Sequence, residues 1–163
     1  MNKQTINKSR FERAFTLIEL LVVISIIGIL IGLSVFGLQG ARVSARDAIR
    51  KTDLEQIRSG LAMFKSDCNI YPNSVTGNNL NLSVSTTLIG NDSTPSCSSS
   101  NQYISKTPLD PLSPTRSYIY DSPDGAGVTY EICASMEQGG STVTCGGSSS
   151  CGGSTCNYKV TNP

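Results

Sequence analysis

Three groups of side chains in this chain of 163 residues could do chemistry. Glu19 is the single charge inside a long apolar run, so it needs a partner of opposite charge. Asp121 and Asp124 lie beside a glycine-rich turn and offer carboxylate oxygens, which are the ligands that Ca²⁺ prefers. Six cysteines offer thiols for disulfides or for a metal: Cys68, Cys97, Cys133, Cys145, Cys151 and Cys156.

The composition argues against an enzyme. The chain has no His, which removes the commonest general base and the commonest metal ligand. Its 13 Lys and Arg nearly balance its 12 Asp and Glu, so no basic field favours a nucleic-acid partner. It also lacks a G-x-x-x-x-G-K-[ST] nucleotide loop. We therefore expect a structural or binding protein with no catalytic residue and no resident cofactor.

Residues 15–38 form an apolar segment that is long enough to cross a bilayer. Four basic residues and one acidic residue precede it, whereas both signs alternate after it, which predicts a cytoplasmic N-terminus and an exported remainder. Because no small-residue cleavage site follows, the segment should remain as a single-pass anchor in the cytoplasmic membrane. All six cysteines fall on the exported side, where an even count indicates disulfides.

A single helix is expected over residues 15–67, because no Pro occurs before Pro72. Its second part, residues 39–67, should pack on a domain through an apolar stripe with spacings of three and four: Leu54, Ile57, Leu61, Phe64 and Cys68. A stripe of small residues points the other way and either meets helices of other subunits or is merely solvated: Ala41, Ala45, Ala48 and Thr52.

The remainder is expected to be a loop followed by a small sheet. Residues 68–106 are rich in Ser, Thr and Asn and indicate a long surface loop, which a Cys68–Cys97 bridge would pin to the helix. Residues 107–163 contain three strand patterns, at 117–120, 127–134 and 157–160. Together these elements predict an α+β fold in which about three antiparallel strands pack on the long helix, stapled by disulfides.

The roles of the four C-terminal cysteines and of Asp121 and Asp124 remain open at this point. The four C-terminal cysteines allow three disulfide pairings, and their spacing selects none of them. Zinc is disfavoured because the spacing contains no C-x2-C knuckle. For Asp121 and Asp124, two carboxylates are few for a cation that takes six to eight oxygens. A turn held by Asx hydrogen bonds is therefore favoured over Ca²⁺ there.

The junction at Phe15 resembles the processing site of type IV prepilins and type II secretion pseudopilins. Residues 13–20, RAFTLIEL, combine the end of a basic leader, a small residue, Phe, and Glu at the fifth position of the mature chain. The DPLSP segment, the Tyr-rich strand, the glycine turn and YEICASME are similar to the C-terminal region of pseudopilin G.

The resemblance implies a type IV pilin-like fold and removal of residues 1–14 by a prepilin peptidase. The cut would fall between Ala14 and Phe15, with methylation of the Phe15 amine and a role for Glu19 in methylation and subunit docking. The family usually has Gly where this chain has Ala14.

The leading functional hypothesis is a structural subunit of a type IV pilus-like filament, a helical homo-oligomer outside the cytoplasmic membrane that is built through the N-terminal helix. An assembly platform protein and an assembly ATPase would be further partners. One alternative is a pseudopilin of a type II secretion pseudopilus. Another is a minor pilin or anchored binding domain that uses tyrosines, although Tyr in strands is more typical of sheet packing: Tyr103, Tyr118, Tyr120 and Tyr130.

Overall fold

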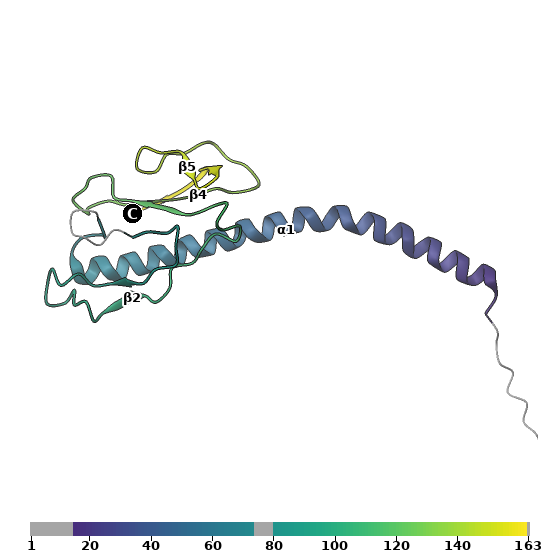
Figure 1. Cartoon of the computed structure of the whole chain (residues 1–163), viewed down its shortest axis with the longest axis horizontal. Helices are drawn as coiled ribbons and strands as arrows, with labels where there is room; N and C mark the ends of the chain where they lie inside the picture. The colour runs from purple at the N-terminus through teal and green to yellow at the C-terminus, as the bar shows by residue number, and fades with distance from the viewer. Residues whose placement is uncertain (1–14, 74–79, 163) are drawn as a thin grey trace, which may run out of the picture. The chain divides into compact units, whose positions relative to one another are not determined.

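The computed structural model describes residues 15–73 and 80–162. The chain divides into two compact units, Met1–Gly40 and Ala41–Pro163. Helix α1, Leu17–Cys68, begins in the first unit and ends in the second (Figure 1). The prediction of one long helix is confirmed.

The ends of α1 follow from local caps. The helix starts two residues after the predicted position, since the Thr16 carbonyl accepts the first intrahelical hydrogen bond, from the Leu20 amide at 3.4 Å. At the other end Asn69 adopts a left-handed φ of 63°, and its amide donates to the Lys65 carbonyl at 2.9 Å. This is an αL cap, which ends a helix without leaving that carbonyl unpaired.

The described residues of the second unit form three small antiparallel sheets. The largest has the strand order β3-β4-β7, with Tyr120 opposite Ile132 and Ile132 opposite Val160. The other two are two-stranded hairpins, β1 with β2 and β5 with β6. The strand bounds are β1 Leu88–Ile89, β2 Gln102–Ile104, β3 Ile119–Asp121, β4 Glu131–Ala134, β5 Ser150–Cys151, β6 Ser154–Thr155 and β7 Tyr158–Thr161.

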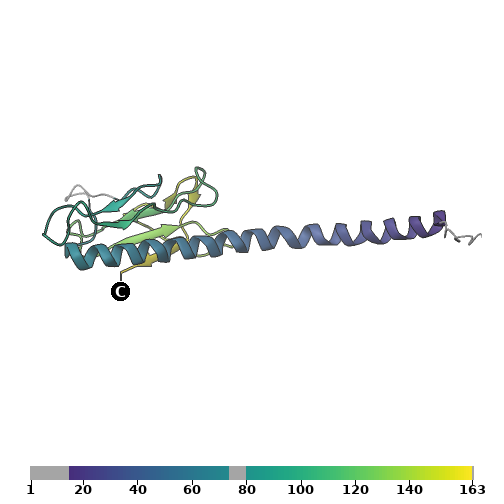
Figure 2. The ribbon, with the colours of Figure 1, turned by 90° about the horizontal axis from the view of Figure 1, so that it is seen from below.

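The core of this unit lies between α1 and the sheets. The predicted stripe is confirmed: Leu54, Ile57, Leu61 and Phe64 have no exposed surface, and they share one cluster with residues of β2, β3, β4 and β7. Figures 1 and 2 show the C-terminal half of α1 running alongside these strands. Each such side chain contributes about 1.5 to 3 kcal/mol by leaving water, so the stripe is a main source of stability for this unit.

The segment 68–106 differs from the predicted surface loop. It contains the β1–β2 hairpin, and its apolar residues Leu80, Leu82, Leu88 and Ile104 are buried in the same core. The hairpin can lie directly on α1 because Gly60 has no side chain: a Cβ there would stand 2.2 Å from Cγ1 of Ile104. The sequence analysis did not predict this packing, because the segment is rich in Ser and Thr and only a few apolar residues make the contacts.

The three strands of the main sheet are shifted or shortened relative to the prediction. The strand expected at 127–134 begins only at Glu131, since the Asp124 carboxylate accepts the backbone amides of residues 126–129 and so removes them from strand pairing. The strands expected at 117–120 and 157–160 lie at 119–121 and 158–161. The strand bounds shift because they depend on which residues face the core and which belong to the turns.

Candidate processing and assembly site

The first turn of α1 is closed by a reciprocal pair of hydrogen bonds between Thr16 and Glu19. The Glu19 carboxylate accepts the Thr16 amide at 2.9 Å and the Thr16 hydroxyl at 2.7 Å. In return the Glu19 amide donates to the Thr16 hydroxyl oxygen at 3.4 Å. This is a capping box, in which two donors that a helix start leaves unpaired find partners. Glu19 therefore has polar partners within its own chain before any processing.

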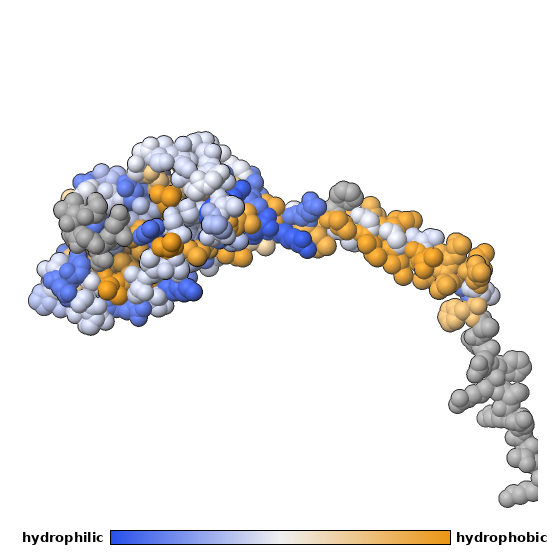
Figure 3. All heavy atoms as spheres, viewed as in Figure 1, coloured by the Kyte–Doolittle hydropathy of each residue, from blue (hydrophilic) through white to orange (hydrophobic). Residues whose placement is uncertain are grey.

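The helix that follows is apolar on all sides. An 18-residue stretch of α1 has a mean hydropathy of 2.8, and none of it is buried. Figure 3 shows one face of this helix, on which apolar side chains predominate. By length and composition this stretch can cross a membrane. Since apolar surface of this extent is unfavourable in water, the first unit needs lipid or other protein around it.

One feature of this helix permits close contacts with another helix, and a second feature suits it to an apolar environment. Gly28, Gly32, Gly37 and Gly40 have no neighbouring atom within 4 Å of an added Cβ, so they leave open notches along the first unit. The two serine hydroxyls bond to carbonyls of their own helix: Ser25 to Leu21 and Ser34 to Leu30, each at 2.8 Å. The polar groups are thus paired within the helix, which suits an apolar environment.

The structure describes only some of the residues that the sequence predicts for processing and assembly. Phe15 is 88% exposed and lies just outside the helix, and Glu19 lies in its first turn. Ala14 and the leader 1–14 lie outside the described residues. The small-residue stripe at Ala41, Ala45, Ala48 and Thr52 is exposed along α1, and none of the residues 15–73 and 80–162 covers it.

A buried ionic cluster holds the start of the second unit together. The Arg50 side chain is completely buried and contacts three carboxylates, those of Asp47, Asp110 and Glu137. Asp47 also accepts the Glu137 amide at 2.9 Å, which ties the segment after β4 to α1. Hydrogen bonds from Arg46, with a smaller contribution from Arg50, lower the pKa of Glu137 to about 2. The cluster therefore joins α1 to two distant loops.

Sequence reasoning missed this cluster, although one signal for it existed. Arg50 lies four residues before Leu54 and so continues the apolar stripe toward the N-terminus. A cation on a core-facing stripe requires buried acidic partners. The identity of those partners was not readable, because Asp110 and Glu137 are 60 and 87 residues away.

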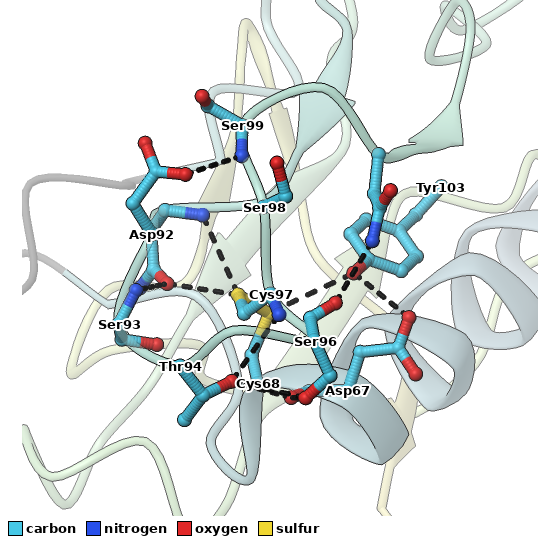
Figure 4. The surroundings of a disulfide bond; sticks show 12 residues. Asp67, Cys68, Asp92, Ser93, Thr94, Ser96, Cys97, Ser98, Ser99 and Tyr103 are labelled. Carbon is cyan, nitrogen blue, oxygen red and sulfur yellow. Dashed lines mark hydrogen bonds between the residues drawn. A yellow bond between two sulfur atoms is a disulfide. The ribbon is translucent and has the colours of Figure 1, made fainter.

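The Cys68–Cys97 disulfide is present, as predicted, at the C-terminal end of α1 (Figure 4). Around it the loop supplies caps for the helix: the hydroxyls of Thr94 and Ser96 donate to the Asp67 carbonyl at 2.9 and 2.8 Å. The Asp67 carboxylate accepts the Tyr103 hydroxyl at 3.0 Å. The loop thus satisfies one of the carbonyls that every helix end leaves unpaired.

The remaining four cysteines pair as Cys133–Cys145 and Cys151–Cys156, which selects one of the three open pairings. All four are buried in a small cluster, packed against Ile119 and Val143. The first bridge attaches the C-terminal loop to β4, and the second spans the β5–β6 hairpin. The disulfides thereby stabilise a glycine- and serine-rich segment that has little apolar surface of its own.

Asp124 acts as a turn residue. Its carboxylate accepts four backbone amides, from residues 126–129, at 2.6 to 3.0 Å, as well as the Thr129 hydroxyl at 2.7 Å. The Thr129 hydroxyl is the largest cause of the lowered pKa of Asp124, about 2. Asp121 lies opposite Glu131 in the sheet. Among the described residues no three His, Cys, Asp or Glu side chains gather as metal ligands, and the favoured Asx-turn interpretation of Asp124 agrees with these contacts.

The four tyrosines considered for ligand stacking are used inside the fold. Tyr118, Tyr120 and Tyr130 are at least 92% buried, and Tyr103 packs edge-on against Phe64 with ring centroids 5.3 Å apart. The Tyr118 hydroxyl donates to Asp53 at 2.6 Å, and the Tyr120 hydroxyl donates to the Pro72 carbonyl at 2.7 Å. These contacts favour the sheet-packing interpretation over an exposed aromatic platform.

Helix α1 starts with a capped turn that contains Glu19 and continues as an unburied apolar stretch, and its second part packs on a small disulfide-bonded β-domain. These features define a pilin-like filament subunit. Residues 9–35 match the prokaryotic N-terminal methylation motif, and residues 38–149 match the type II secretion system protein G family. The chain belongs to this protein G family.

Relatives with known names agree. The chain is 31% identical to the type II secretion system core protein G of Pseudomonas aeruginosa, over 81% of this chain and 90% of the relative. It is 29% identical to the core protein G of Vibrio cholerae, over 82% and 88% of the two chains. The match to the Escherichia coli core protein G is 38%, over 40% and 46%. No solved structure matches the chain. The family is that of a structural protein, not an enzyme.

Proposed function

We propose that the chain is a subunit of a type II secretion pseudopilus, cut between Ala14 and Phe15, methylated on the new Phe15 amine, and polymerised through α1. The observation that carries this proposal is the exposed apolar surface of α1, which no other described residue covers. In the membrane lipid covers this surface, and in a filament the helices of neighbouring subunits take the place of the lipid. The family match points to secretion rather than to a surface pilus.

The proposed precursor has its N-terminus in the cytoplasm and its disulfide-bonded unit outside the cytoplasmic membrane. The excess of basic residues before residue 15 supports this orientation, and so does the position of every cysteine after the apolar stretch. An assembly platform protein and an assembly ATPase would move the subunits, because the chain has no nucleotide-binding loop of its own. No metal is required in this proposal, since the Asp124 carboxylate already accepts six hydrogen bonds.

Glu19 is proposed to fix the position of each subunit along the filament. Its carboxylate lies one helical turn from the Phe15 amine that cleavage would create, and the amine of a neighbouring copy is the other available cation. The pair would be buried among apolar helices, where removing one partner leaves an uncompensated charge.

The test is intact mass spectrometry of the protein from its native host, comparing membranes with sheared filaments. The expected mass is that of residues 15–163 with one methyl group, enriched in the sheared fraction and increased by six hydrogens on reduction. Glu19→Leu should be exported and stored in equal amounts but should yield few filaments. An uncut chain confined to membranes, or normal filament yield from Glu19→Leu, would contradict the proposal.

A surface pilus is the second candidate. The observation that favours it is the number of disulfides, because three bridges in one small unit suit a fibre exposed outside the cell. Deleting the gene and measuring secreted enzymes against surface filaments separates the two: loss of secretion supports the pseudopilus, and loss of filaments with normal secretion supports the pilus.

A further inference from the structure

Each disulfide joins two cysteines that follow one another in chain order. The pairs are Cys68–Cys97, Cys133–Cys145 and Cys151–Cys156, so no bridge spans another cysteine. Most of the other pairings that six cysteines allow would join cysteines that are not consecutive. The observed pairing arises if each cysteine that leaves the membrane pairs with the preceding one that is still free. It therefore requires no prior contact between distant segments.

The cysteines are inaccessible once the second unit has packed. All six are at most 2% exposed. Thiol–disulfide exchange requires one sulfur to approach another directly, so its rate depends on access. A protein that carries a reactive disulfide reaches these sulfurs only if the unit opens. The bridges therefore form before the residues around them pack.

The surroundings of the first bridge come from one short part of the chain. Two loop hydroxyls and the tyrosine of β2 bond to Asp67 at the end of α1, and all three lie within residues 94–103 (Figure 4). Cys97 itself lies in the loop between β1 and β2. All of these residues precede Cys133. The first bridge can thus form, and its surroundings can assemble, before the later cysteines leave the membrane.

The main sheet is completed only by the last strand of the chain. Strand β4 contains Cys133 and lies between β3 and β7. Strand β7 begins at Tyr158, after Cys156. At about 5 to 20 residues per second, synthesis takes roughly 3 to 12 s to advance from Cys97 to β7. Catalysed disulfide formation can occur within seconds, so the chain order leaves time for oxidation before burial.

We infer that a dithiol-oxidation reaction acts on this chain during export and forms the three disulfides in chain order, before the second unit packs and without an isomerisation step. The oxidant is a protein of the exported compartment that carries a reactive disulfide. The inference rests on the proposed orientation, in which residues 39–163 leave the cytoplasmic membrane in sequence.

The exchange balances at each bridge. For the first bridge, the Cys68 thiolate attacks one sulfur of the oxidant's disulfide, which forms a mixed disulfide and releases a thiolate on the oxidant. The Cys97 thiolate then attacks Cys68 Sγ and releases the second thiolate of the oxidant. The chain loses two protons and two electrons, and the oxidant is reduced to a dithiol.

The first experiment compares strains of the native host that lack either the exported dithiol oxidase or the exported disulfide isomerase. Free thiols are alkylated with N-ethylmaleimide at harvest, and the full-length chain is analysed by intact mass and by non-reducing peptide mapping. We expect loss of the oxidase to leave most of the chain reduced. Loss of the isomerase should leave the amount of correctly paired chain unchanged. After a short labelling pulse, Cys68–Cys97 should be the first bridge detected.

A cysteine variant separates pairing by chain order from pairing by packing. In Cys133→Ser, made in the strain without the isomerase, chain order pairs Cys145 with Cys151 and leaves Cys156 free. If packing directs the pairing, Cys151 keeps Cys156 and Cys145 stays free. Cys156→Ser is the matched control, because both routes then leave Cys151 free. The pairs are read from the alkylated chain, so the result does not depend on whether the variant folds.

Three results overturn the inference. A wild-type chain that is mispaired without the isomerase shows that isomerisation is required. A Cys151–Cys156 bridge in Cys133→Ser, or a Cys68–Cys97 bridge that appears last in the wild type, shows that packing directs the pairing. Either result leaves the proposed function intact. A wild-type chain whose six cysteines stay reduced in the host contradicts the proposed orientation and this inference with it.

Discussion

The Asp110 carboxylate accepts two hydrogen bonds from the buried guanidinium of Arg50, from Nε at 2.7 Å and from Nη2 at 3.0 Å. Neither side chain of the pair is exposed. This bidentate contact joins α1 to the DPLSP segment, and Glu137 joins the same arginine to the segment after β4. One buried cation therefore attaches α1 to two segments of the domain, in addition to the apolar stripe.

Arg50→Met should lower the free energy of unfolding of the second unit by about 3 to 5 kcal/mol, because it leaves buried carboxylates without their counter-charge. Urea unfolding of the full-length protein in detergent, followed by tyrosine fluorescence, measures the loss. Arg42→Met is the matched control, since Arg42 is exposed on α1, and it should cost less than about 1 kcal/mol. Equal effects of the two variants would show that the cluster is not a main support.

Stability should fall in acid partly through Glu137. Its pKa in the folded protein is about 2, below the ordinary 4.5, because of the hydrogen bond from Arg46. A group with a lowered pKa contributes stability that is present above its unfolded pKa and is lost as the pH falls, here between about 4.5 and 2. Glu137→Gln should make the midpoint of urea unfolding depend less on pH in that window. Glu55→Gln, on the exposed side of α1, should leave the profile unchanged, and a flat wild-type profile would contradict the assignment.

The Cys68–Cys97 and Cys151–Cys156 disulfides should differ in their contribution to the free energy of unfolding. Cys68 and Cys97 are separated by 29 residues and Cys151 and Cys156 by 5. In the chain-entropy model, the longer loop stabilises by about 3.5 kcal/mol and the shorter by about 2. Replacing each pair by Ser and comparing urea unfolding tests this order. A larger loss for the 151–156 pair would mean that native packing, not loop closure, governs these bridges.

The turn after β3 should be insensitive to calcium but sensitive to Asp124. In the wild type, adding CaCl₂ or EGTA should leave the melting temperature unchanged, because hydrogen-bond donors already occupy the Asp124 carboxylate. Asp124→Ala should lower the melting temperature, since it leaves the amides of residues 126–129 without that acceptor. Asp92→Ala, in another exposed loop, provides a comparison. A rise in melting temperature with Ca²⁺ that Asp124→Ala abolishes would instead establish a cation site.

Much of this protein was readable from local patterns. The apolar segment 15–38, the single helix and the stripe from Leu54 to Phe64 depend on residues close together in the chain, and all three predictions are confirmed as helix or core. The junction at Phe15 is likewise a local motif, and the methylation-motif match at residues 9–35 agrees with it. Short-range periodicity suffices for such features, because one element determines them.

Only the tertiary structure decided which distant groups meet. The partners of Arg50, the pairing of the four C-terminal cysteines and the β1–β2 hairpin each join segments whose contacts no local pattern specifies. Gly60 is an example, since its lack of a side chain matters only once Ile104 lies on α1. Helix and strand preferences act along the chain, whereas charge pairing and close packing act through space, and for that reason the sequence determined the elements and the fold determined their contacts.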